Sequence, residues 1–130
     1  MHTHRSFQNP PALPHDEVVE ALERALRDRA PAADEIEAPS VLVGSALNDE
    51  DREFVEYWCV QVGTRATAGS QLLGLAGLCL GHTARRFGKL SDEALALVRS
   101  LAARAEADPS DVDGRALDGL DDVRSFLHLW

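Results

Sequence analysis

Positive charge is scarce in this chain of 130 residues. Its 13 lysines and arginines stand against 22 aspartates and glutamates, a formal net charge of −9 at pH 7, and Lys89 is the only lysine. A protein that binds nucleic acid or an anionic membrane needs the opposite balance, because it must neutralise phosphates. The composition argues against both partners. It is compatible with a basic protein partner, although an acidic surface also serves solubility alone.

Cysteine and aromatic residues are few as well. Cys59 and Cys79 form no Cys-x-x-Cys pair and lie in apolar surroundings, which indicates small buried side chains in a reducing compartment rather than a disulfide framework. Aromatic residues make up 5% of the chain, while Ala, Leu, Arg and acidic residues dominate. This composition favours helices over sheets, so we predict an all-α protein with one domain.

No segment is well suited to a membrane or to export. The stretch 67–84 (TAGSQLLGLAGLCLGHTA) carries no charged side chain, but its Gly, Ser, Gln and His make it too polar and too short for a membrane span. Residues 1–14 contain three prolines and lack the apolar core of a signal peptide. We expect a disordered arm over 1–14, a single helical domain over 15–130, a cytoplasmic location and a monomer when free.

Helical periodicity begins after this arm. A first helix is predicted over 16–29, where one face carries Val18, Val19, Leu22, Ala25 and Leu26. The proline-bounded segment 31–39 indicates a connector, and Pro39 is placed to start a second helix over 40–47.

The next predicted helix follows Asn48 directly. Asn48 is expected to cap this helix, three acidic residues fill its first turn, and Gly63 ends it. Four of its residues are expected to face inward: Phe54, Tyr57, Trp58 and Val62.

The uncharged stretch belongs to a further helix over 70–87, closed by Gly88. One stripe of it carries Leu72, Ala76, Leu80, Thr83 and Phe87. Gly74, Gly77 and Gly81 line one face, and each costs roughly 1 kcal/mol of helix stability relative to alanine. We expect the compensation to be close approach of a neighbouring helix backbone.

A fainter copy of this helix follows 40 positions later, over 110–128. The same relative positions carry Val112, Ala116, Leu120, Val123 and Leu127, and Gly114 matches Gly74. Between the two copies, Ser91 is expected to cap another helix. The chain therefore contains two similar helix pairs, about 49–87 and 91–128, and stacking such units buries one continuous core.

A resemblance to HEAT-repeat proteins is carried by this spacing, by the pattern LLGLAGLCLGHTARRFG and by its echo VDGRALDGLDDVRSFL. It implies a short right-handed α-solenoid of antiparallel helix pairs over roughly 40–128. The strings LCLGHTARRFGKL and ALDGLDDVRSFL also resemble small bacterial HEAT-like immunity proteins of polymorphic-toxin systems. This second resemblance implies an immunity protein that binds and neutralises a cognate toxin. The alternative is a HEAT-like scaffold or regulatory protein with a non-toxin partner.

Signatures of catalysis are weak. Cys79 and His82 are three positions apart on one predicted helix, and Cys59 offers a third metal ligand, but no signature places an acid or base beside them. No serine lies in a Gly-x-Ser-x-Gly elbow, and GLAGLCLG lacks the Lys-Ser/Thr ending of a phosphate loop. We predict a non-enzyme without cofactor or metal, with a small enzyme or metalloprotein built on those three residues as the alternative.

Acidic residues concentrate near the C-terminus, where seven acids and one base lie between Glu106 and Asp122. Asp111, Asp118 and Asp122 are expected on one exposed strip of the last helix. The partner-binding residues that we predict are Glu106, Asp111, Asp118, Asp121 and Asp122. Such a strip would complement a basic toxin domain and steer its association, whereas the alternative is a solvated face that compensates the helix dipole.

Overall fold

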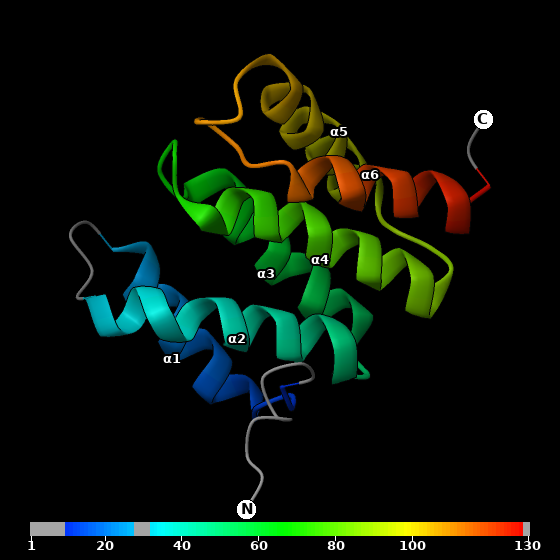
Figure 1. Cartoon of the computed structure of the whole chain (residues 1–130). Helices are drawn as coiled ribbons and strands as arrows, with labels where there is room; N and C mark the ends of the chain where they lie inside the picture. Colours follow the sequence, from blue (N-terminus) through cyan, green and yellow to red (C-terminus); the bar gives the residue numbers. More distant parts are fainter. Residues whose placement is uncertain (1–9, 28–31, 129–130) are drawn as a thin grey trace, which may run out of the picture.

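Helices account for all the regular structure in the computed structural model, which describes residues 10–27 and 32–128 (Figure 1). The elements are α1 (His15–Leu26), α2 (Ala32–Asn48), α3 (Arg52–Arg65), α4 (Gln71–Phe87), α5 (Asp92–Ala107) and α6 (Arg115–Phe126). No strand occurs in this described part, so the prediction of an all-α protein is confirmed. None of its helices combines the length and the apolar character needed to cross a bilayer.

Helix α4, which carries no charged residue before Arg85, is the centre of the arrangement. It packs against α2, α3, α5 and α6, while α1 packs mainly against α2 (Figure 1). The fully buried leucines come from four helices and form one core: Leu22, Leu42, Leu73, Leu80 and Leu101. This position explains why α4 is apolar over most of its circumference, since it has neighbours on several sides.

Local sequence signals set the ends of α4 and the start of α5. Ser70 caps α4 by accepting a hydrogen bond from the Leu72 N–H (3.1 Å), and Gly88 ends it in the left-handed conformation with φ of 71°. Ser91 caps α5 by accepting from the Ala94 N–H (3.1 Å). The predicted boundaries of α4 and the predicted Ser91 cap are confirmed.

Helices α4 and α6 touch backbone to backbone. A Cβ added to Gly119 would overlap the carbonyl group of Gly77 and lie 2.9 Å from the Leu78 nitrogen. A Cβ added to Gly81 would lie 2.9 Å from the Gly119 carbonyl oxygen. The predicted close approach of a neighbouring helix is therefore confirmed, and the neighbour is α6.

The register of this contact gives the relative direction of the two helices. Gly74 lies against Asp113, Gly77 against Ala116, and Gly81 against Gly119. Because the positions rise together along both helices, α4 and α6 run parallel, as Figure 1 also shows.

The 40-residue repeat is visible in burial. Four of the five matched positions are buried in both copies: Leu72, Ala76, Leu80 and Thr83 with Val112, Ala116, Leu120 and Val123. The match of Gly74 with Gly114 does not extend to packing. Gly74 is buried against Asp113, whereas Gly114 is exposed and has open space where a Cβ would lie.

The predicted connector over 31–39 and the helix start at Pro39 are wrong. Helix α2 begins at Ala32 and carries Pro39 in its interior. An interior proline removes one helical hydrogen bond and costs about 3 kcal/mol. The helix persists because it buries Ala38, Val41 and Leu42 in the core. At the other junction, α1 ends at Leu26 rather than at the predicted residue 29, which lies outside the described residues.

The predicted start and end of α3 also need correction. Asn48 is the last residue of α2, and the cap of α3 is Asp51, whose carboxylate accepts from the Phe54 N–H (3.1 Å). The helix continues past Gly63 to Arg65. Of its four expected inward residues, Trp58 and Val62 are buried, Phe54 is half-buried and Tyr57 is exposed.

The described end of the N-terminal arm is packed against α2. Asn48 Nδ2 donates a hydrogen bond to the Pro10 carbonyl (2.7 Å), and the Pro11 carbonyl fills the space beside Gly44. At the start of α1, the His15 ring stacks on Phe54 with a centroid separation of 3.5 Å. Of the arm that we expect to be disordered, residues 10 and 11 contact α2 in the structure, and 1–9 lie outside the described residues.

Candidate functional site

The predicted acidic surface residues are divided by the structure. Asp118 and Asp121 are exposed on α6, and Glu106 is exposed near the end of α5. Asp122 is half-buried, because its Cβ lies against α4 at Gly81. Its negative charge also acts to raise the pKa of His82. Only part of the predicted strip is therefore fully available to a partner.

Asp111 is not on the last helix, contrary to prediction. The helix begins at Arg115 rather than at residue 110, because the preceding residues form turns, and in the last of these Asp113 Oδ1 accepts from the Arg115 N–H (2.9 Å). Asp111 lies in the preceding connection, where Arg104 donates two hydrogen bonds to it (2.8 and 2.7 Å). This pairing lowers the pKa of Asp111, so the carboxylate is engaged within the molecule.

Two of the three proposed metal ligands, Cys59 and Cys79, lie side by side, but His82 does not complete a metal-binding group with them among the described residues. Cys59 and Cys79 are both buried, and a hydrogen bond with Cys79 together with burial raises the pKa of Cys59 well above its usual range. His82 is half-buried, and its pKa is lowered by burial and by Arg85. Within residues 10–27 and 32–128, no group of three His, Cys, Asp or Glu side chains is placed to hold a metal ion.

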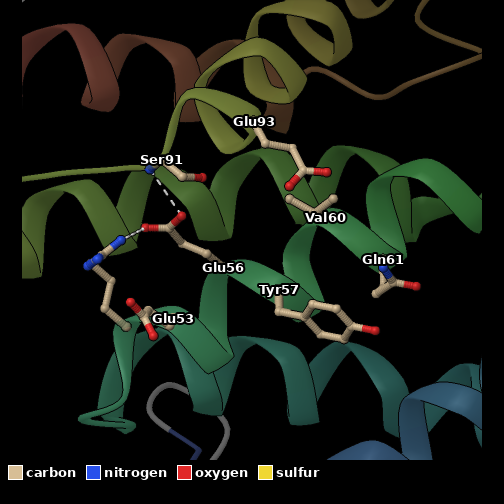
Figure 2. A pocket seen from close by; sticks show the side chains of 8 residues that line it. Glu53, Glu56, Tyr57, Val60, Gln61, Ser91 and Glu93 are labelled. Atoms are coloured by element: carbon tan, nitrogen blue, oxygen red, sulfur yellow. Dashed lines mark hydrogen bonds and ion pairs between the residues drawn. The ribbon is translucent and has the colours of Figure 1, made fainter.

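A cavity between α3 and the start of α5 was not predicted from the sequence (Figure 2). It encloses about 300 Å³. Eight residues line it: Arg52, Glu53, Glu56, Tyr57, Val60, Gln61, Ser91 and Glu93. We call it the α3–α5 pocket.

One wall of the pocket is a buried carboxylate shared by two helices. Glu56 accepts hydrogen bonds from the Arg52 guanidinium and from the Ser91 N–H (3.1 Å). In a capping box, a Glu in the first turn of the same helix would accept from the N–H of the capping residue. That position of α5 is Ala94, which has no acceptor, so Glu56 of α3 supplies one from outside the helix.

The remaining pocket carboxylates are exposed. Glu53 lies one turn before Tyr57 on α3, and Glu93 comes from the first turn of α5 (Figure 2). No ion pair or hydrogen bond within the described part of the chain engages either carboxylate. With Glu56 and Arg52 included, three carboxylates face one guanidinium, which leaves an excess of two negative charges around the pocket.

An exposed aromatic ring completes the pocket. Tyr57 is 55% exposed, although its neighbour Trp58 is 4% exposed and contacts the Tyr57 ring edge-on at a centroid separation of 5.4 Å. A negatively charged recess beside an exposed aromatic ring is suited to a cationic group. The sequence held a signal for this face, since Glu53, Tyr57 and Gln61 are spaced four apart and share one side of a helix.

Comparisons with known proteins identify no relative from which a function could be inferred. No family model matches the chain, and no curated protein or solved structure shows significant similarity to it.

Proposed function

We propose that this protein is a protein-binding module, most concretely a cytoplasmic immunity protein that binds and neutralises a cognate bacterial toxin. The observation that carries the proposal is the parallel contact of α4 with α6, whose buried stripes repeat 40 residues apart. Repeat arrays stack equivalent helices in this way and bind partners on the surface that the stack presents. In this proposal the chain is a short right-handed HEAT-like solenoid of antiparallel helix pairs.

The charge distribution supports a basic partner. The formal net charge is −9, and Glu106, Asp118 and Asp121 extend into solvent. Carboxylates on such a surface accelerate encounter with a basic protein and improve selection among partners. We assign partner binding to these residues and to Asp122, and leave Asp111 to its contact with Arg104.

The test begins with the neighbouring genes. Cells that express a toxin domain encoded beside this gene should survive when this protein is co-expressed, and calorimetry should show binding between the two purified proteins. Absence of both rescue and binding would contradict the immunity function. Isolation of a stable complex with a different, non-toxic protein would instead favour the scaffold alternative.

A matched pair of variants connects the function to the surface. Asp118→Asn/Asp121→Asn removes two exposed negative charges without removing side-chain volume. If α6 faces the toxin, the association rate should fall by about tenfold at low salt and much less at high salt. Asp16→Asn/Glu17→Gln removes two exposed charges from α1 and is the control for net charge.

A further inference from the structure

We propose that the α3–α5 pocket is the receptor for an arginine side chain presented by the protein partner. The arginine would lie over Tyr57 and pair with the carboxylates of Glu53 and Glu93. This inference rests on the proposed partner-binding function and deepens it, because it identifies the chemical group of the partner that the pocket takes.

The charges of the pocket favour a cation. Glu56 is buried and paired with Arg52 and Ser91, so the net negative charge of the pocket comes from Glu53 and Glu93. Glu53 and Glu93 are exposed and can reorient toward an incoming group. Because Glu93 and Asp92 lie in the first turn of α5, they also offset the partial positive charge of that helix end.

The shape of the pocket favours a side chain over a larger ligand. Its volume of about 300 Å³ is at the small end of the range for ligand sites. Tyr57 lines the pocket and is exposed, so it presents a flat aromatic surface to a ligand. A guanidinium is planar, stacks on aromatic rings and pairs with a carboxylate through two hydrogen bonds, so arginine fits this combination better than lysine does.

The test uses a hexapeptide of arginine, with the lysine and citrulline hexapeptides for comparison. Tyr57 is the only tyrosine of the chain, so its ring resonances report on the pocket without ambiguity in an NMR titration. The arginine peptide should shift these resonances in a saturable way. The lysine peptide should bind several-fold more weakly, and the uncharged citrulline peptide should leave the resonances unchanged.

Two double variants separate the pocket from general electrostatics, since each removes two exposed negative charges. Glu53→Gln/Glu93→Gln should raise the dissociation constant of the arginine peptide about tenfold. Asp16→Asn/Glu17→Gln, on α1, should change it less than about twofold. Tyr57→Leu should weaken binding while Tyr57→Phe largely preserves it, because the ring supplies the contact.

The outcomes exclude one another. Equal weakening by both double variants, or binding of the arginine peptide without movement of the Tyr57 resonances, would overturn the proposal, as would no binding at all. If the toxin is neutralised but Glu53→Gln/Glu93→Gln leaves its binding unchanged, the pocket proposal fails and the immunity function stands. If the peptide binds in the pocket but no toxin is neutralised, the function fails and the pocket remains a guanidinium site.

Discussion

The contact between α4 and α6 and the contact between α3 and α5 are built in opposite ways. Between α4 and α6, glycines remove side chains until the Gly77 carbonyl group lies against Gly119. Between α3 and α5, carboxylates and a tyrosine leave a recess of about 300 Å³. The first contact leaves no room for a Cβ at Gly81 or Gly119, whereas part of the second leaves this recess open.

The difference separates a contact that stabilises the fold from one available for binding. Close backbone packing contributes dispersion along the whole crossing of α4 and α6. Exposed carboxylates contribute little to stability, since surface ion pairs are worth about 1 kcal/mol or less. Within the α3–α5 contact, the buried Glu56 stabilises the fold, because it accepts a hydrogen bond from Ser91 and so connects α3 to the start of α5.

The largest expected effect on stability comes from adding a methyl group to the contact between α4 and α6. Gly119→Ala should lower the free energy of unfolding by about 3 kcal/mol, because the new methyl group overlaps the backbone of α4 at Gly77 and Leu78. Urea denaturation followed by circular dichroism measures this change. Gly114→Ala is the control and should change stability by less than about 0.5 kcal/mol, since open space surrounds that position. Equal stabilities of the two variants would contradict the backbone contact.

The next largest effect on stability comes from removing the buried carboxylate of Glu56 in the α3–α5 pocket. Glu56→Ala should cost about 2 kcal/mol, because it leaves the Ser91 N–H and the Arg52 guanidinium without their acceptor. Glu56→Gln should cost less, since its amide oxygen can still accept from Ser91. Glu53→Ala, one turn away and exposed, is the matched control and should be nearly neutral in the same denaturation experiment. A Glu56→Ala protein as stable as the Glu53→Ala protein would show that this carboxylate does not hold α5.

A smaller effect concerns Asp113, which lies beside Gly74 at the start of α6. Hydrogen bonds from Arg115 lower the pKa of Asp113 in the folded protein. The folded state then binds fewer protons than the unfolded state, so this contribution is present at neutral pH and is lost as pH falls through the lowered pKa. The stability advantage of the native protein over Asp113→Asn should be under about 1 kcal/mol at pH 7 and should shrink as the pH falls through the lowered pKa of Asp113. An advantage that stays constant over this acid range would assign Asp113 a role independent of its charge.

The smallest effect is expected in the pocket itself. Glu53→Gln/Glu93→Gln should change the free energy of unfolding by less than about 0.5 kcal/mol, because neither carboxylate has an ion-pair partner among the described residues. Thermal denaturation at low salt provides the measurement. A loss of 2 kcal/mol or more would mean that these carboxylates stabilise the fold, and the contrast between the two contacts would disappear.

Features that depend on a few adjacent residues could be predicted from the sequence. The Ser70 cap and the Gly88 terminus of α4 follow from local hydrogen bonding and backbone conformation. The glycine face of α4 indicated a close neighbour, because three glycines in one helix are costly unless packing compensates. The sequence did not identify that neighbour, and the structure shows that it is α6.

Features that depend on distant residues were not predictable in the same way. Pro39 is tolerated inside α2 because burial of its neighbours outweighs the local penalty. Tyr57 was expected to face inward, but it lies on the exposed side of α3. Because α3 buries most of its circumference, the sequence alone does not show which side remains exposed. The α3–α5 pocket arises from where α5 packs, and no local signal fixes that position.

The central place of α4 has a consequence for hydrogen exchange. Many repeat proteins lose a terminal unit while the rest stays folded, because each unit touches only its neighbours. Here α4 contacts α2, α3, α5 and α6, so any opening that exposes its amides must separate most of the described structure. The amide protons of α4 should therefore exchange only through global unfolding, and their exchange rates should report the stability of the whole domain.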